Sequence, residues 1–240
     1  MHSWSRIVAF GFTVAACICS RPCIGAAPAP ADALSTALNK IRSLNSYAVE
    51  FVRSDESGGV SSRHHRRIMY SRPSRYYIED LEVLVQSTVA EGRKQTVCVP
   101  KMTTLVTQDV RWDYSREVRQ YSRLSLDSQH EDPGVQFAPP MRLIESLSEV
   151  SNGGHEVLAI DGKRFDCEVI RAKAPPSVEF TFWIDTSTGF IVKHIARGPD
   201  RTVSVEILSI EVNPEIPPNL FIFEPAEGWR ESSEYRCGSR

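Results

Sequence analysis

The chain lacks the short motifs that mark the common classes of enzyme. It contains no Gly-x-Ser-x-Gly nucleophile turn, no phosphate-binding loop and no glycine cluster of the dinucleotide-binding type. His155-Glu156 has no second histidine at zinc-protease spacing, and the adjacent His64 and His65 would face opposite sides of a strand instead of sharing a metal. Because we find no catalytic constellation, the sequence predicts a protein that is not an enzyme and has neither a metal site nor a cofactor.

The chain also has little charge of one sign. Its 28 Lys and Arg residues face 30 Asp and Glu residues, and the net charge of -2 gives no general attraction to nucleic acid. The one dense basic run, Arg63-His64-His65-Arg66-Arg67, fits either a docking site for an acidic partner or a solvated hairpin. Hydrophobic residues make up 41% of the chain, which argues against disorder and for one domain with a sizeable core.

The amino terminus has the pattern of a secretory signal. One positive charge within Met1–Arg6 precedes the ten-residue apolar run Ile7–Ala16, which is too short to span a bilayer. Cleavage after Ala27 would release a soluble chain, so we predict a signal peptide at 1–27 and a linker at 28–32. No second hydrophobic segment of membrane length follows. The mature protein is therefore expected to be exported to the periplasm.

A second cleavage site gives the alternative location. Val14-Ala15-Ala16-Cys17 resembles the lipobox of bacterial lipoproteins, in which Cys17 would be acylated after cleavage. A flexible stretch after Cys17 would then tether the domain to the outer membrane. We predict the soluble form and keep the lipid-anchored form as the alternative.

Three cysteines remain after the soluble cleavage: Cys98, Cys167 and Cys237. An odd number in an oxidising compartment allows one disulfide and one free thiol, and the sequence does not select the pair. No Cys-x-x-Cys motif supports a thioredoxin-like role. Because Cys237 lies in the polar tail at 231–240, we favour a Cys98–Cys167 pair across neighbouring strands.

The spacing of apolar residues predicts two helices and a long run of strands. Leu34, Leu38 and Ile41 fall on one helical face, and Asp32 is placed to cap that helix. A second helix is expected to open at Pro139-Pro140, with Leu143, Ile144 and Leu147 on one face.

Between and after these helices the hydrophobic period is two, which predicts strands joined by short turns. Residues 111–138 are polar and look like the least structured part of the chain. Sequential hairpins favour antiparallel pairing, so residues 33–230 are predicted to form a single α+β domain.

Five motifs, in this order along the chain, give the resemblance to a known family. They are Ser46-Tyr-Ala48-Val-Glu-Phe51, Arg72-Pro73, Glu91-Gly92-Arg93, Pro140-Met-Arg-Leu143 and Phe221-Ile-Phe223-Glu-Pro225-Ala-Glu-Gly228. Together they resemble the periplasmic lipoprotein carriers and receptors LolA and LolB over roughly residues 33 to 229. The chain departs from that family in having Glu-Gly-Arg in place of Asp-Gly-Lys, and in a longer region before the second helix. We therefore expect a divergent member.

The resemblance implies a curved antiparallel sheet, a half-open barrel, with helices plugging its concave face. It also implies that Arg72 hydrogen-bonds carbonyls of the plugging helix and loop, and so acts as a latch on an apolar cavity. Arg72 shares strand parity with Ile68 and Tyr70, where a bare guanidinium is costly. The alternative is that the strand ends at Arg72 and its side chain simply reaches water.

The candidate cavity wall consists of the inward-facing residues of the strands and of the second helix. Acyl chains suit such a wall because they need no directional partner and gain about 0.8 kcal/mol per buried CH₂. The other interpretation is that these are ordinary core residues. The wall residues are Val49, Phe51, Ile68, Tyr70, Val85, Phe180, Phe182, Val205 and Ile207, with Leu143 and Ile144 from the helix.

We accordingly expect an exported carrier or chaperone that binds acyl chains or lipoproteins during outer-membrane lipoprotein sorting. Its expected partners are an acylated lipoprotein or other hydrophobic ligand, an inner-membrane export complex and an outer-membrane receptor, with no nucleic acid. The protein itself is expected to be a monomer. Two alternatives use the same fold: an envelope sensor or regulator that binds a protein or lipid signal, and a lipidated outer-membrane receptor.

Overall fold

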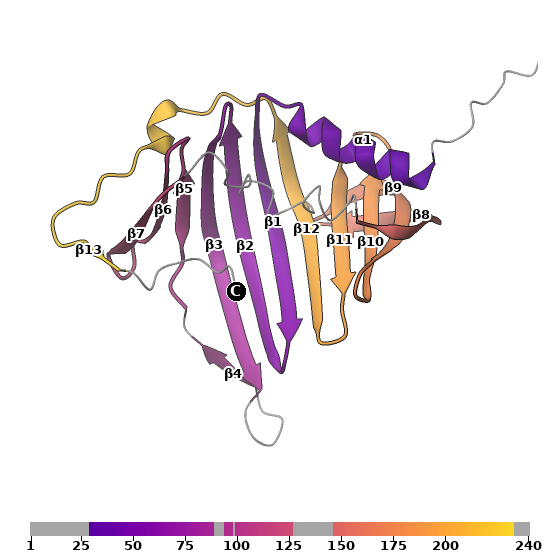
Figure 1. The fold of residues 1–240 in the computed structure, drawn as a ribbon, viewed down its shortest axis with the longest axis horizontal. Helices are drawn as coiled ribbons and strands as arrows, with labels where there is room; N and C mark the ends of the chain where they lie inside the picture. The colour runs from indigo at the N-terminus through magenta and orange to yellow at the C-terminus, as the bar shows by residue number, and fades with distance from the viewer. Residues whose placement is uncertain (1–28, 89–93, 98, 127–145, 233–240) are drawn as a thin grey trace, which may run out of the picture.

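The structure is a computed structural model, and it describes residues 29–88, 94–97, 99–126 and 146–232. These residues form one long sheet with an α-helix against it (Figure 1). The elements are α1 (Pro30–Arg42), β1 (Ser46–Ser57), β2 (Val60–Ser71), β3 (Arg75–Thr88), β4 (Lys94–Val97), β5 (Thr103–Val106), β6 (Val110–Ser115), β7 (Gln120–Ser125), β8 (Ser148–Ile160), β9 (Lys163–Ala174), β10 (Val178–Asp185), β11 (Ile191–Arg197), β12 (Arg201–Val212), the 3₁₀ turn η2 (Pro218–Phe221) and β13 (Arg230–Glu231).

The strands follow one another in a single sheet. Their spatial order is β13-β7-β6-β5-β3-β2-β1-β12-β11-β10-β9-β8, with β4 also paired to β3. Every pair is antiparallel except β13 with β7. The tight β1–β2 turn needs positive φ at both central residues, and Gly58 (φ 56°) and Gly59 (φ 79°) supply it. Sequential hairpins therefore build the sheet, as the period-two pattern predicts.

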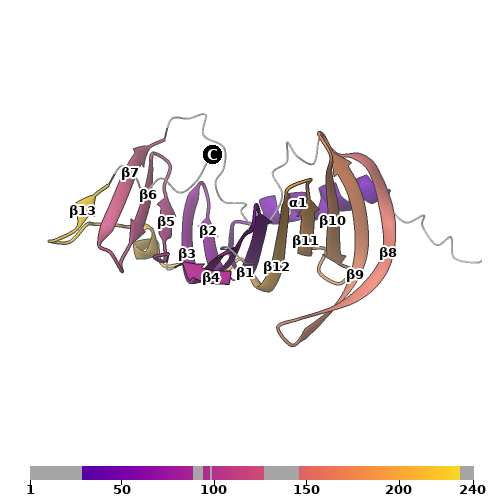
Figure 2. The same ribbon diagram turned by 90° about the horizontal axis from the view of Figure 1, so that it is seen from below.

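The sheet curves into an open trough. Register shifts occur between Glu50 and Phe51 where β1 meets β12, and between His65 and Arg66 where β2 meets β3. Such bulges bend a strand and increase its twist. Figure 2 shows the result: β8–β10 rise on one side, β5–β7 rise on the other, and α1 lies inside the curve. The predicted curved, half-open α+β sheet with a helix on its concave face is confirmed.

The main core lies between α1 and the concave face. Leu34, Ala37, Leu38 and Ile41 of α1 are buried at spacings of three and four, so they share one side of the helix. They pack against alternate residues of the strands, because successive side chains of a strand point to opposite faces. The helix thus covers the apolar part of the trough.

The ends of the helices differ from the predictions. Helix α1 begins at Pro30, inside the predicted linker, with Ala29 as its N-cap and no side-chain cap, so the prediction that Asp32 caps it is wrong. Proline suits a first helical turn because its missing N–H has no partner there anyway. The predicted second helix, with Leu143 and Ile144, lies outside the described residues. Leu147 directly precedes β8 and packs against the main core.

Residues 111–126, which looked unstructured, form most of the hairpin β6–β7. Trp112 and Tyr114 alternate with Arg111 and Asp113, so the composition is polar although one face is aromatic. That face is opposite to α1, because Trp112 lies across from Leu105, and Leu105 across from Tyr77. The prediction for these residues is wrong because it relied on their overall polarity and not on the alternation of aromatic and polar residues, which indicates a strand. Residues 127–138 lie outside the described part of the chain.

The carboxy-terminal segment packs on this aromatic face. The Phe223 ring stacks on Tyr114, with centroids 4.1 Å apart, and meets Trp112 at 5.3 Å and Trp229 at 5.4 Å. Tyr77, Leu105 and Phe221 are buried in the same cluster. The motif at the end of the chain therefore has a structural role: its aromatic residues pack on the outer face of the sheet. We call this packing of Phe221, Phe223 and Trp229 the clasp.

The predicted Cys98–Cys167 disulfide is not formed. Cys167 is a free thiol with no exposed surface, on the face of β9 opposite to the main core. It packs with Val169, Trp183 and Val192, and burial raises its pKa to about 11. Cys98 lies outside the described residues. The odd cysteine count left the pairing open, and Cys167 instead serves as a small apolar core residue.

Replacing Phe223 tests the clasp. We expect Phe223→Ala to lower the free energy of unfolding by about 2–3 kcal/mol, because it removes a half-buried ring with four aromatic neighbours. Ile222→Ala is the matched control, because the neighbouring side chain is 64% exposed, and we expect a change below about 0.5 kcal/mol. Urea denaturation measures both, and equal losses would contradict the clasp.

Candidate functional site

The concave face is the candidate site, and its apolar half lies under α1. Seven predicted wall residues are buried there in one cluster with the helix, and Tyr70 packs against that cluster. Val85 is half-buried near the far end of β3, opposite Val97 of β4, and lies outside the cluster. Leu143 and Ile144 are not among the described residues. The seven are Val49, Phe51, Ile68, Phe180, Phe182, Val205 and Ile207.

Arg72 fixes the carboxy-terminal end of α1. Its Nε donates to the carbonyl of Leu44 at 3.1 Å, and its Nη2 donates to the carbonyl of Arg42 at 2.9 Å. The last carbonyls of a helix have no partner within the helix, and the planar fork of Arg72 reaches one of them, that of Arg42, together with the Leu44 carbonyl of the loop that follows. The contact that the family resemblance implies is thus present. Arg72 is nevertheless exposed to solvent, so this contact lies at the rim of the core.

Lys40 holds the helix at a second point. Its Nζ donates to the carbonyl of Thr188 in the β10–β11 turn and lies 5.0 Å from the centroid of the Phe190 ring. Asp185 braces the same turn by accepting bonds from the Thr188 N–H at 2.8 Å and the Ser187 hydroxyl at 2.6 Å. The polar contacts that Lys40 and Arg72 make for α1 are therefore both near its carboxy-terminal half.

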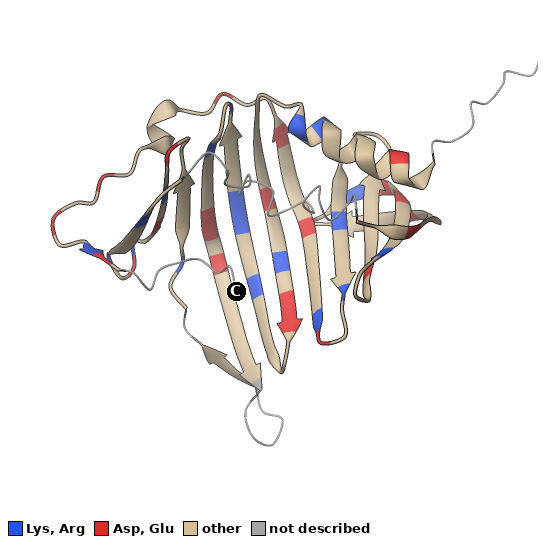
Figure 3. Ribbon diagram, in the orientation of Figure 1, with Lys and Arg blue, Asp and Glu red and all other residues tan. Residues whose placement is uncertain are grey.

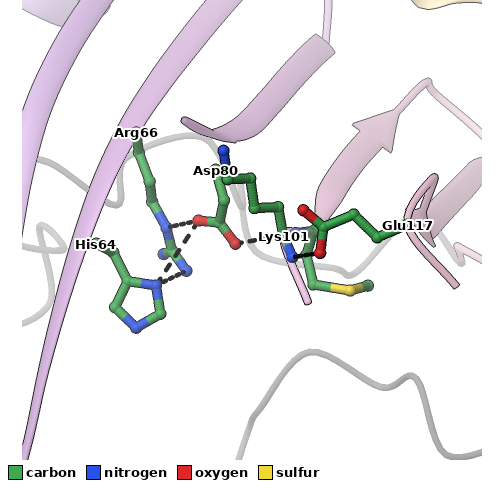
Figure 4. Close-up of polar contacts among 6 residues, drawn as sticks. His64, Arg66, Asp80, Lys101 and Glu117 are labelled. Atoms are coloured by element: carbon green, nitrogen blue, oxygen red, sulfur yellow. Dashed lines mark hydrogen bonds and ion pairs between the residues drawn. The ribbon is translucent and has the colours of Figure 1, made fainter. Parts of the chain in front are cut away.

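The other half of the concave face carries charge. Figure 3 shows Lys, Arg, Asp and Glu gathered in the middle of β1–β3, away from the end that α1 covers. Arg66 Nε donates to Asp80 Oδ1 at 2.6 Å, and the Met102 N–H donates to Asp80 Oδ2 at 3.2 Å (Figure 4). His64 Nδ1 is 3.7 Å from Asp80 Oδ1. Asp80 is therefore surrounded by donors.

These donors set the charge of Asp80. Burial alone would raise its pKa, but the nearby His64 ring, the charge and hydrogen bond of Arg66 and the Met102 N–H together lower the pKa below its usual value. Asp80 is therefore a stable carboxylate. The basic run of β2 divides by parity: His64 and Arg66 join Asp80, whereas His65 and Arg67 contact Glu50 on the opposite face. It does not form one basic surface.

A second carboxylate, Asp55, lies further along β1. Arg201 Nε donates to Asp55 Oδ1 at 2.9 Å, its Nη2 donates to Oδ2, and Arg53 Nη2 lies 3.5 Å from Oδ2. Burial lowers the pKa of Arg53, Asp55 opposes this, and the charges of Arg66 and Arg201 lower it further. Arg53 therefore lies close enough to Arg66 and to Arg201 for both charges to act on it.

His194 on β11 completes this half. It is 8% exposed, and its Nδ1 has no hydrogen-bond partner among the described residues. Burial, helped by the charge of Arg53, lowers the pKa of His194 to about 4, so the ring is neutral near pH 7. This polar half was not predicted from the sequence. It could have been predicted, because the alternation of the strands places three charged residues on the concave face: Arg53, His64 and Arg66.

The outer face offers a contrasting pocket of about 430 Å³ over β8–β11. Its lining includes His155, Glu156, Arg171 and Glu179, and Trp183 Nε1 donates to Glu156 at 2.8 Å. This polar lining does not suit a hydrocarbon. Over the described ranges, no helix is long and apolar enough to cross a membrane, and no group of three or more His, Cys, Asp or Glu could hold a metal ion.

Comparison with known proteins places the fold. No protein-family model matches the chain, and no curated protein does. The solved structure of an uncharacterized conserved protein from Thermus thermophilus matches with a TM-score of 0.51 at 7% identity, over 84% of this chain and 99% of that one. At that identity the match shows the fold alone.

Two further structures are similar at a lower score. The lipoprotein LppX from Mycobacterium tuberculosis matches with a TM-score of 0.48 at 13% identity, over 78% of this chain and 97% of that one. A LolA superfamily protein from Nitrosomonas europaea matches with a TM-score of 0.37 at 13% identity, over 82% and 99%. The second of these structures bears the name of the family that the motifs resemble.

The pKa of His194 has a consequence for stability. Between pH 6.5 and 4 the unfolded chain binds a proton on this ring that the folded chain does not bind. The free energy of unfolding should therefore fall with falling pH across this window, and His194 should contribute no further loss below about pH 4.

We expect His194→Leu to reduce that slope by up to one proton, about 1.4 kcal/mol per pH unit. Denaturant unfolding at several pH values measures it. His155→Leu is the control, because His155 is exposed on β8 and should leave the slope unchanged. A wild-type slope in the His194→Leu variant would show that the folded chain binds the His194 proton as readily as the unfolded chain does.

Proposed function

We propose that the protein is an exported carrier that binds hydrocarbon chains of a lipid or lipoprotein against the apolar half of the concave face, after α1 moves aside. The observation that carries this proposal is that one short helix covers the wall, with the polar contacts of Lys40 and Arg72 near its carboxy-terminal half. A helix of 13 residues is marginally stable without tertiary packing. The cover is therefore a separable element of the fold.

An acyl chain can replace the helix side chains at similar energy. Burying a leucine side chain gains about 1.5–3 kcal/mol, and burying a CH₂ gains about 0.8 kcal/mol. About eight methylenes therefore offset the exposure of Leu34, Leu38 and Ile41. The exchange needs no directional partner, since both the wall and the chain are apolar.

Export and lipoprotein sorting extend this proposal. The signal-like leader and the ordered family motifs support a periplasmic carrier that receives cargo from an inner-membrane export complex and delivers it to an outer-membrane receptor. On this proposal the protein acts as a monomer, without catalysis and without a cofactor. The soluble form, cleaved after Ala27, fits a carrier that crosses the periplasm.

Arg72→Leu tests the latch. Removing two donors from the carbonyls of Arg42 and Leu44 should shift α1 toward its displaced state. Two hydrogen bonds of about 0.5–1.5 kcal/mol each hold the closed state, so we expect about tenfold tighter binding of a fluorescent fatty acid. Arg72→Lys keeps the charge but loses the planar fork. Its affinity for the fatty acid should therefore lie between those of the wild-type protein and of Arg72→Leu.

Arg164→Leu is the matched control, because Arg164 is an exposed strand arginine on β9. Thermal unfolding establishes that each variant is folded. Unchanged affinity in a folded Arg72→Leu variant would show that Arg72 does not control the opening of α1 and only contacts the end of the helix. If the wild-type protein binds no hydrophobic probe, the carrier proposal fails and the sensor alternative gains.

A further inference from the structure

Arginines outnumber carboxylates in the paired charges of the polar half of the concave face. Three arginines there, Arg53, Arg66 and Arg201, contact the two carboxylates Asp55 and Asp80. The charges of Arg66 and Arg201 both act against the charge of Arg53, which is also partly desolvated. A further anion placed among these guanidiniums would relieve that repulsion.

The same surface is open to solvent on one side. The side chain of Arg201 is 56% exposed and that of Arg53 is 29% exposed. A small anion can therefore approach these two guanidiniums without unfolding the sheet.

The charged half adjoins the apolar wall directly. Arg53 follows Phe51 by two residues on the same face of β1, a distance of about 7 Å along a strand. Across the sheet, Arg53 lies opposite Val205, Val205 opposite His194, and His194 opposite Phe182. A molecule with a hydrocarbon chain on the wall would therefore have its end group beside Arg53.

His194 adds an unfilled hydrogen-bonding position at the boundary. Its Nδ1 is buried and without a partner among the described residues, and the ring lies 6.2 Å from the centroid of Phe182. Buried polar atoms of native proteins normally have a partner. The lack of one here points to a ligand group or a ligand-bound water.

We propose that Arg53, flanked by Arg66 and Arg201 and with His194 across β12, binds the oxyanion of an amphiphile, a carboxylate or a phosphate, whose chain lies on the apolar wall. This inference rests on the proposed function and specifies its ligand class. Planar guanidiniums suit either oxyanion because they can donate in pairs.

The test compares two ligands that differ only in their end group. Oleate and oleyl alcohol displace an uncharged fluorescent probe at pH 8, below their aggregation concentrations. We expect wild-type protein to bind oleate about tenfold or more tightly than the alcohol, as for one charge-assisted interaction. Inorganic phosphate at millimolar concentration should compete only weakly, because it lacks the chain.

Arg53→Gln should remove most of this preference and leave oleyl alcohol binding unchanged. Arg67→Gln is the matched control: Arg67 is a β2 arginine on the opposite face, with Nη2 3.2 Å from a Glu50 oxygen, and should change neither affinity. Arg201→Gln, at a more exposed position, provides a second variant if Arg53→Gln fails to fold.

The outcomes separate the two proposals. Equal binding of oleate and oleyl alcohol, unaffected by Arg53→Gln, would contradict the proposed oxyanion site and leave the carrier proposal standing. Displacement by neither ligand would overturn both. Binding of inorganic phosphate as tight as that of oleate would show a site for free anions and contradict the proposal that the ligand is an amphiphile.

Discussion

The structure depends on covering one apolar surface. A sheet that curves without closing leaves its concave face open to water, and Val49, Phe51 and Ile68 on the central strands would be exposed there without a second layer. Helix α1 supplies that layer with the side chains of one face. The sheet itself is continuous and needs no helix for its hydrogen bonds, so the helix can be exchanged for another apolar object without breaking the ladder.

The charged half of the trough limits where that exchange can occur. Asp80 and Asp55 hold arginines at fixed positions on β1, β2 and β12, and along β1 the apolar wall ends where Arg53 begins. A hydrocarbon chain that follows β1 meets a charged side chain at the inward position after Phe51. Along this strand the face is therefore apolar toward Arg72 and charged beyond Phe51, and that direction matches the two ends of an amphiphile.

Much of this arrangement could be predicted from the sequence, for identifiable reasons. Alternation placed Phe51, Phe180 and Phe182 on one face, because strand parity is a local property. The contact of Arg72 with the helix came from the family motif, since no local rule brings residues 72 and 42 together. The polar half was missed although strand parity marks it, because Arg53, His64 and Arg66 lie at the inward positions of β1 and β2 and only the apolar residues at those positions were assigned to the face. The hairpin with Trp112 was missed because its polar residues outnumber its aromatic ones.

The central claim is that ligand and α1 compete for the same wall, and hydrogen exchange tests it most directly. Backbone amides of Leu34–Ile41 should exchange slowly in the free protein and faster when oleate is bound, because a displaced 13-residue helix frays. Amides in the middle of β1 and β12 should keep their protection, since the ladder is unaffected. Unchanged or increased protection of α1 in the presence of bound oleate would contradict the account, because the ligand would then lie somewhere other than on the wall that the helix covers.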